Sequence, residues 1–225
     1  MSSNATSAAK KKRVLLVEDH PVVRHGLRGL IDDQGDLTVV GEAASMAEAV
    51  PLFRDARPDV GVIDITLGDG NGLDLIRKLH EMDQAIPLLG LSMHDEAVYA
   101  ERVLRAGGKG YIMKKEAMDK LLTAIRRVLA GELYVSEAMA TKLVHKLINP
   151  SAPRAEPEGV AALSEREFQV FRLIADGIGP SEIAQRLGLS VKTVETHREH
   201  IKDKLNLKSG SELTRFCLQW AMEHQ

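Results

Sequence analysis

The sequence predicts a doubly wound α/β domain with a five-stranded parallel sheet, followed by a smaller all-α domain. Short apolar runs alternate five times with stretches of helical periodicity between residues 13 and 131. Five consecutive βα units are typical of a parallel sheet that is covered by helices on both faces. The proline-rich polar run Asn149–Gly159 then indicates a flexible linker, and only helical patterns follow it.

The strands are expected where apolar residues form short runs. They are Arg13–Glu18, Leu37–Ala43, Asp59–Asp64, Ile86–Leu91 and Lys109–Ile112. The third run is continuous in apolar character and is bounded by a turn signal and a glycine-rich loop, so we expect it to be buried on both faces. A strand order of 2-1-3-4-5, as in flavodoxin-like folds, would place the first and third strands side by side.

The helices of the first domain are expected where apolar residues recur at helical spacing. They lie near residues 21–34, 46–56, 71–82, 96–106 and 116–130, with a further helix at about 136–148 that Ser136 can cap.

The C-terminal part predicts a compact set of helices. Ser164 and Glu167 form a capping-box signature for a first helix that ends near Gly177. A short helix at 180–187 stops at Gly188, and Ser190 caps a longer helix at 191–205, before a last one at about 209–223. A short helix, a glycine turn and a longer helix are typical of a helix-turn-helix.

Composition limits the functional classes. The chain has 225 residues, of which 44% are hydrophobic and 28% are charged, as in an ordinary globular protein of about two domains. No apolar run approaches about 18 residues and the first residues are polar, so neither a membrane span nor a signal peptide is expected. The single cysteine, Cys217, fits a reducing cytoplasm. A net charge of −2 does not by itself predict a nucleic-acid partner.

Carboxylates stand at the ends of two predicted strands. Glu18 and Asp19 follow the first strand, and Asp64 ends the third. The carboxyl ends of neighbouring parallel strands meet at one edge of a sheet, where ligands bind. Ionised carboxylates crowd together favourably only around a cation, and oxygen ligands of this kind suit magnesium. The sequence therefore predicts a magnesium site, with Asp64 as the acceptor of a phosphoryl group.

Two further groups follow the last two strands, Ser92 and Lys114. A hydroxyl and an ammonium group at this edge can hold the remaining oxygens of an aspartyl phosphate. Taken singly, a serine after a strand is more often a helix cap, and a lysine is more often a solvated charge. That four strand ends all carry the required group favours the functional interpretation.

These groups are Glu18-Asp19, Asp64, Ser92 and Lys114. In their order and spacing they resemble the receiver domain of bacterial two-component response regulators. The resemblance covers about residues 12–131. It implies that Asp64 takes a phosphoryl group from a phosphohistidine of a partner sensor histidine kinase. It also implies a magnesium ion held by Asp19, Asp64 and the main-chain oxygen of Thr66, with Glu18 assisting. Ser92 and Tyr111 would form the switch pair, and Lys114 would bind the phosphate.

The C-terminal motifs resemble the LuxR-type helix-turn-helix: Leu163–Glu167, Glu182–Ala184, Leu189–His197, Ile201 and Lys204-Leu205. The whole chain is thus similar to the NarL/FixJ subgroup of response regulators. This implies a receiver domain at 12–131, a linker helix and linker at 132–160, and a DNA-binding domain at 161–225. The implied function is not enzymatic: phosphorylation would switch sequence-specific binding to a double-stranded DNA operator and regulate transcription.

On the predicted 191–205 helix, Val194, Ile201 and Leu205 form an inward stripe, with His197 partly buried beside it. The candidate DNA-contacting residues are Lys192, Thr193, Glu195, Thr196, Arg198, Glu199, Lys202 and Lys204. The carboxylate of Glu195 can accept a hydrogen bond from cytosine, whereas Glu199 can instead pair with Lys202 or face solvent. The cations Arg198, Lys202 and Lys204 suit phosphate contacts.

The last helix carries an apolar stripe formed by Leu213, Phe216, Cys217 and Trp220. Such a stripe closes a small helical core. The family resemblance adds that this helix mediates dimerisation on DNA, so that a homodimer reads an inverted repeat.

Two questions stay open at this stage. Phosphorylation can act by releasing the 191–205 helix from occlusion by the receiver, or by receiver dimerisation alone. A phosphatase with Asp64 as nucleophile is the enzymatic alternative, but Asp64-Ile65-Thr66 lacks the second acid that would protonate a leaving group. A DNA-binding protein with a relic receiver is a third reading, which the intact acidic set disfavours.

Overall fold

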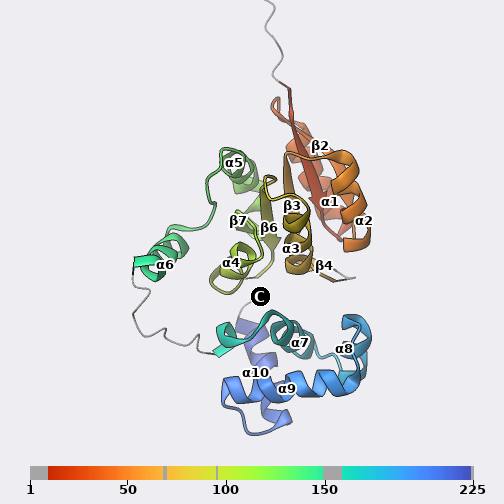
Figure 1. Cartoon of the computed structure of the whole chain (residues 1–225), viewed down its shortest axis with the longest axis vertical. Helices are drawn as coiled ribbons and strands as arrows, with labels where there is room; N and C mark the ends of the chain where they lie inside the picture. Colours follow the sequence, from red (N-terminus) through yellow and green to blue (C-terminus); the bar gives the residue numbers. More distant parts are fainter. Residues whose placement is uncertain (1–9, 68–69, 95, 149–158, 224–225) are drawn as a thin grey trace, which may run out of the picture. The chain divides into compact units, whose positions relative to one another are not determined.

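A computed structural model describes residues 10–67, 70–94, 96–148 and 159–223 (Figure 1). The chain separates into two compact units. One contains the residues up to Ser92 together with Arg102–Tyr134, and the other contains Met93–Glu101 together with the chain from Val135. The expected linker lies outside the described residues, except for its last residue, Gly159.

The first unit is built on a five-stranded sheet of order β2-β1-β3-β6-β7, in which every neighbouring pair is parallel. The strands are β1 Lys12–Val17, β2 Leu37–Ala43, β3 Val60–Asp64, β6 Leu88–Ser92 and β7 Gly110–Met113. This confirms the predicted order 2-1-3-4-5. Because Val17 pairs with Ile63, the residues that follow β1 and the last residue of β3 lie at the same edge of the sheet.

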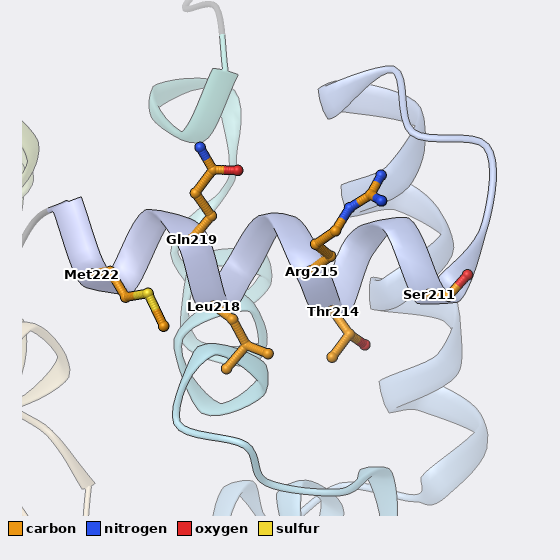
Figure 2. Close-up of a pocket in the computed structure, with 6 residues that line it drawn as sticks. All are labelled: Ser211, Thr214, Arg215, Leu218, Gln219 and Met222. Carbon is orange, nitrogen blue, oxygen red and sulfur yellow. The ribbon is translucent and has the colours of Figure 1, made fainter.

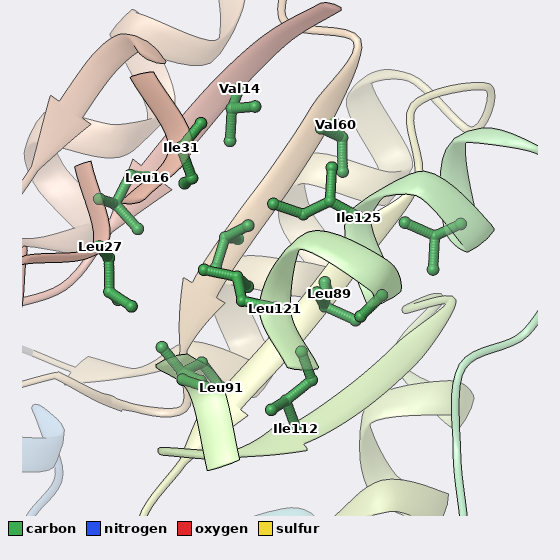
Figure 3. Packing of buried hydrophobic residues seen from close by; sticks show 14 of the residues in the cluster. Val14, Leu16, Leu27, Ile31, Val60, Leu89, Leu91, Ile112, Leu121 and Ile125 are labelled. Atoms are coloured by element: carbon green, nitrogen blue, oxygen red, sulfur yellow. The ribbon is translucent and has the colours of Figure 1, made fainter. Parts of the chain in front are cut away.

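Helices pack on both faces of this sheet. They are α1 Pro21–Asp32, α2 Met46–Ala56, α3 Gly72–Met82, α4 Glu96–Arg105 and α5 Ala117–Leu129, and the helix α6 Glu137–Ile148 comes next in the chain. Figure 3 shows the apolar cluster on one face, where α1 contributes Leu27 and Ile31 and α5 contributes Leu121 and Ile125. The buried side chains of α2 and α3 stand outside this cluster, and both helices contact the strands.

Short elements follow two of the strands that supply the predicted site. A two-stranded antiparallel hairpin, β4 Thr66–Leu67 and β5 Gly70–Asn71, comes directly after β3. The 3₁₀ helix η1, Lys114–Glu116, comes directly after β7. These elements were not predicted, because two or three residues are too few to show a periodic pattern.

The C-terminal part of the second unit is helical, with a 3₁₀ turn η2 at Gly159–Ala162. Its helices are α7 Glu165–Ala175, α8 Pro180–Leu187, α9 Val191–Leu205 and α10 Gly210–Glu223. The predicted capping box is confirmed, since the Ser164 N–H donates to Glu167 at 2.7 Å and the Ser164 hydroxyl accepts from the Glu167 N–H at 3.4 Å. Nowhere in the ranges given above is a helix both long and apolar enough to cross a membrane.

Aromatic rings form the centre of the helical domain. The ring of Trp220 from α10 meets those of Phe168 and Phe171 from α7 edge-on, with centroids 6.1 and 5.2 Å apart. Val194 and Ile201 of α9 are fully buried, as the predicted inward stripe requires. This core fixes which face of α9 remains outside.

Candidate functional site

The carboxylates that end β1 and β3 come together as predicted. One ligand atom from each of Glu18, Asp19, His20 and Asp64 lies within 4.8 Å of the others. The side chains of Glu18 and Asp64 are fully buried, whereas that of Asp19 keeps 24% of its exposure. This cluster, which we call the acidic pocket, therefore contains two buried carboxylates and a third that is partly exposed.

Lys114 closes this pocket from the end of β7. Its ammonium nitrogen lies 2.6 Å from an oxygen of Glu18 and 2.9 Å from Oδ2 of Asp64, and its side chain is only 8% exposed. Buried charges are tolerated when they are paired and hydrogen-bonded, and this cation offsets the repulsion between the two carboxylates.

The same contacts shift the acidity of the pocket. Burial raises the pKa of Asp64 to about 6; Lys114 opposes this rise and the neighbouring Glu18 adds to it. Burial alone would lower the pKa of Lys114, but the two carboxylates outweigh it and leave that pKa raised. Lys114 therefore stays cationic at neutral pH, and Asp64 is mostly ionised at pH 7.

The backbone around Asp64 is held from two sides. The Thr66 N–H donates to Oδ1 of Asp64 at 2.9 Å, which fixes the carboxylate plane. At the start of α3, a Cβ atom on Gly72 would lie 2.0 Å from the main-chain oxygen of Asp64. Only glycine allows α3 to begin this close to the end of β3, a requirement that the sequence pattern did not reveal.

Ser92 and Tyr111 lie on the strands next to β3. Ser92 ends β6 one residue beyond Leu91, the register partner of Asp64, and it is fully buried. Tyr111 lies in β7 opposite Gly90 and is 2% exposed, so its ring is inside the domain. The structure thus places both predicted switch residues at or near the edge that carries the acidic pocket.

His20 is a member of the pocket that the sequence analysis missed. Its Nδ1 lies 2.7 Å from an oxygen of Asp19 and 3.0 Å from an oxygen of Glu18. Arg24, one turn further along α1, donates to the main-chain oxygen of Glu18 at 2.6 Å. The only signal for His20 in the sequence is its position next to Glu18 and Asp19, and this position does not indicate a role.

The donor set suits a divalent cation. Three carboxylates within 4.8 Å offer the oxygen ligands that magnesium prefers, and the partial exposure of Asp19 leaves the mouth open to water. The residues able to hold the ion are Glu18, Asp19 and Asp64, with His20 adjacent.

The helix-turn-helix is formed by α8 and α9. Gly188 ends α8 with a φ of 63°, a left-handed conformation that favours glycine, and the Ser190 hydroxyl caps α9 by accepting from the Thr193 N–H at 3.1 Å. The outer face of α9 exposes Lys192, Glu195, Thr196 and Glu199. These are the residues predicted to face base edges.

The other predicted DNA-contacting residues are less exposed. Arg198 is 17% exposed and lies 3.3 Å from Glu195, and Lys202 is 16% exposed and lies 2.7 Å from Glu199. The second pair matches the alternative in which Glu199 binds Lys202 rather than a base. Thr193 is half-buried and its hydroxyl lies 2.8 Å from that of Ser190.

Lys204 is paired within its own domain. Its ammonium nitrogen lies 2.6 Å from the carboxylate of Glu167, and Nδ1 of His200 lies 3.7 Å from the same carboxylate. Burial would raise the pKa of Glu167, but Lys204 and the Ser164 cap outweigh it and lower that pKa. Lys204 therefore ties α9 to α7 while its side chain keeps 39% of its exposure, and its phosphate contact stays a prediction.

The core-closing role predicted for the apolar stripe of α10 is confirmed, whereas the dimerisation role predicted for the same residues requires a correction. Leu213 and Cys217 are fully buried and Trp220 is 8% exposed, while the partly buried Phe216 packs on Phe171 with ring centroids 6.1 Å apart. Burial raises the pKa of the Cys217 thiol to about 12. These residues close the core of their own domain and do not form an outer surface.

A different face of α10 is exposed. It contains a shallow hollow lined by Ser211, Thr214, Arg215, Leu218, Gln219 and Met222. Figure 2 shows Thr214, Leu218 and Met222 on the same side of the helix. The side chains of Leu218 and Met222 are 40% and 80% exposed.

Comparison with known proteins identifies both domains. Residues 14–126 match the response regulator receiver domain, and residues 161–217 match the bacterial regulatory proteins of the luxR family. The oxygen regulatory protein NreC of Staphylococcus carnosus is 38% identical over 210 residues, which cover 92% of this chain and 97% of that protein. NreC of Staphylococcus aureus strain MRSA252 is 39% identical over 212 residues, with the same coverage.

Solved structures agree. A two-component response regulator of the LuxR family from Aurantimonas sp. SI85-9A1 is 35% identical, with a TM-score of 0.56, over 61% of this chain and 99% of its own. RcsB from Salmonella enterica serovar Typhimurium, bound to promoter rprA in the presence of phosphomimetic BeF3−, shares the fold over 92% of this chain and 98% of its own, at 22% identity and a TM-score of 0.68. The chain therefore belongs to the NarL/FixJ-type two-component response regulators, which join a receiver domain to a LuxR-type helix-turn-helix.

Proposed function

We propose that Asp64 accepts a phosphoryl group from a phosphohistidine of a partner sensor histidine kinase, and that this switches DNA binding and transcription. The observation that carries the proposal is the position of Lys114, 2.9 Å from Asp64 and 2.6 Å from Glu18 in a buried acidic pocket. A pocket of this kind offers an ionised acceptor together with a cation for the oxygens that arrive.

The transfer of the phosphoryl group is a single displacement at phosphorus. A carboxylate oxygen of Asp64 attacks the phosphorus, a P–O bond forms, and the P–N bond to the kinase imidazole breaks. The imidazole leaves with the electron pair and takes up a proton. Lys114 and the Ser92 hydroxyl then hold the phosphoryl oxygens of the aspartyl phosphate. Magnesium bound by Glu18, Asp19, Asp64 and the Thr66 main-chain oxygen would neutralise charge on those oxygens.

The local geometry supports an acceptor rather than a phosphatase. A phosphatase with an aspartate nucleophile needs an acid that protonates the leaving group. Two residues after Asp64 the chain has Thr66, whose N–H is already donated to the Asp64 carboxylate at 2.9 Å. Membership of a family of DNA-binding regulators supports the same conclusion.

DNA binding is proposed to use α9 as the recognition helix in the major groove. Lys192, Glu195, Thr196 and Glu199 are the exposed candidates for base edges, and Arg198 and Lys202 flank them for phosphates. A homodimer would read an inverted repeat, and we assign its contact to the exposed Leu218 and Met222 face of α10. A charged substitution, Leu218→Glu, should weaken dimeric DNA binding without unfolding the domain.

The phosphorylation test uses a small phosphodonor. The full chain is incubated with acetyl phosphate and magnesium, and its intact mass is measured. We expect the wild type to gain one hydroxylamine-labile phosphoryl group and to bind its DNA sites more tightly. Asp64→Asn should gain none, whereas the exposed, remote Asp55→Asn should behave as wild type. No adduct on the wild type, or an adduct that survives Asp64→Asn, would contradict the proposal.

A second titration separates two routes from phosphate to DNA. If the receiver occludes α9, the 160–225 fragment binds DNA more tightly than the unphosphorylated full chain. If the receiver acts by dimerisation alone, the fragment binds no more tightly than the full chain, and the phosphorylated full chain binds better than either.

A further inference from the structure

The residues that follow α5 form an extra edge on the receiver sheet. After α5 the chain turns back, and Tyr134 lies alongside β7 in parallel. The Tyr111 N–H donates to the Tyr134 carbonyl oxygen at 2.9 Å, and the Tyr134 N–H donates to the Lys109 carbonyl oxygen at 2.9 Å. We call Glu132–Tyr134 the edge strap, because it covers the side of β7 that no strand of the five-stranded sheet covers.

The end of α5 holds the edge strap in place. Gly131 turns the chain with a φ of 87°, and the Glu132 N–H donates to the Arg127 carbonyl oxygen at 3.0 Å. The Arg127 guanidinium pairs with Glu132 at 2.7 Å and stands over the Tyr134 ring, 5.5 Å from its centroid. The Tyr134 ring also packs on the apolar cluster beneath α5. The edge strap thus has its own backbone, ionic and apolar contacts.

Gly110 is the residue of β7 that makes room for the edge strap. A Cβ atom there would lie 2.6 Å from the Tyr134 carbonyl oxygen and 2.8 Å from its Cβ. Both atoms belong to or adjoin the backbone and cannot swing aside, so any side chain at position 110 pushes the edge strap away. Glycine in a strand usually weakens the strand, because it is conformationally permissive. Here its lack of a side chain allows the backbone at Tyr134 to approach β7 closely.

The edge strap joins two parts of the proposed switch. On one side it is hydrogen-bonded to Tyr111, the buried switch residue, three positions before Lys114. On the other side the chain continues within two residues into α6 and the linker. A backbone hydrogen bond weakens steeply when its donor and acceptor move apart or out of line. A displacement of β7 at Tyr111 must therefore move or release Tyr134.

We propose that the edge strap transmits the state of the Asp64 pocket to the linker, so that the receiver ends functionally at Tyr134. This inference rests on the proposed function, because it assigns a route to the phosphorylation signal. The edge strap is formed in the structure in which Tyr111 is buried. In this route, phosphorylation raises the share of molecules in which Tyr111 is inside the domain, and these are the molecules in which the edge strap is formed.

Amide hydrogen exchange of the full chain tests the first half of this inference. Peptides covering 109–115 and 130–136 are followed by mass spectrometry, with and without acetyl phosphate and magnesium. We expect exchange at Tyr111 and Tyr134 to slow on phosphorylation of the wild type. Gly110→Ala should raise exchange in both peptides. Gly29→Ala on α1 is the matched control, since a Cβ there meets nothing within 4 Å.

DNA affinity tests the second half. The readout is the ratio of affinities with and without phosphate on Asp64, for which couplings of roughly 5- to 150-fold are typical. Gly110→Ala should still accept the phosphoryl group but lose this ratio, which falls to about 1, while Gly29→Ala keeps it. Tyr134→Pro is the second variant: it removes the N–H donated to Lys109 and the ring that packs beneath α5, leaves the hydrogen bonds within the five-stranded sheet in place, and should have the same effect.

The outcomes are distinct. The inference is overturned if exchange in the edge strap is unchanged by phosphorylation of the wild type. It is also overturned if Gly110→Ala and Tyr134→Pro release the edge strap and keep the full wild-type ratio. A wild type that accepts phosphate and binds DNA with unchanged affinity instead refutes the proposed function itself.

Discussion

The ammonium nitrogen of Lys114 lies 2.9 Å from Oδ2 of Asp64, although the two residues are 50 positions apart in the sequence. Each comes from the carboxyl end of a parallel strand, and the sheet order brings those ends to one edge. This pair, together with Glu18, makes a pocket that is charged, buried and compact. Its properties lead to the first two predictions.

Lys114→Ala should lower the free energy of unfolding in the absence of metal by about 3 kcal/mol, since it leaves buried carboxylates without their cation. Added magnesium should recover part of this loss. Urea unfolding with and without magnesium measures both effects. Lys120→Ala is the control: its ion pair with Glu116 is exposed, so the change should stay below about 1 kcal/mol. Equal losses in the two variants would contradict the prediction.

Magnesium affinity should fall as the pH drops below about 6. Asp64 has a pKa of about 6, so a proton competes with the metal for its carboxylate below that pH. At pH 5 only about one molecule in ten has Asp64 ionised, and affinity should be about tenfold weaker than at pH 7. Calorimetric titration at the two pH values measures this. Asp64→Asn should bind magnesium weakly, with the same affinity at both pH values. A wild-type magnesium affinity that does not change with pH would contradict the prediction that Asp64 is a titrating ligand.

Glu167→Gln should destabilise the DNA-binding domain at neutral pH by about 1 kcal/mol, because it removes the charge that pairs with Lys204 while a glutamine oxygen can still accept from the Ser164 N–H. The pKa of Glu167 is lowered by folding. Its carboxylate therefore adds stability above its ordinary pKa, and this contribution is lost as the pH falls through the folded-state value. Thermal unfolding across that range should show the gap between variant and wild type closing. Glu182→Gln is the control. Glu182 forms an exposed ion pair with Arg186, so this substitution should change the stability of the domain little at any pH.

Lys192→Ala and Lys204→Ala should differ in their effect on the salt dependence of DNA binding. Lys192 is exposed on the outer face of α9, so its removal should reduce the slope of log affinity against log salt by about 0.9. Lys204 is already paired with Glu167 at 2.6 Å, so its removal should leave the slope unchanged and lower domain stability. Binding titrations at several salt concentrations decide this. The reverse pattern would return Lys204 to a phosphate-contacting role.

The sequence by itself determined the five strands of the main sheet, the α-helices and their order along the chain. The bounds of α2, α8, α9 and β2 agree with prediction, and the caps at Ser164 and Ser190 form as expected. These features follow from patterns local to each segment: helical or alternating periodicity, glycine stops, and a hydroxyl next to a free N–H group. The sheet order was also accessible, because the predicted metal site requires β1 and β3 to be neighbours.

Only the tertiary structure decided which partners the side chains choose. Lys204 turned to Glu167, Leu213 and Cys217 turned inward, and Tyr134 paired with β7. Periodicity names the apolar face of a helix, but whether that face meets its own core or another molecule depends on how helices cross. Likewise, a charged side chain is within reach of both solvent and a neighbouring element, and the lower free energy depends on distances that exist only after packing.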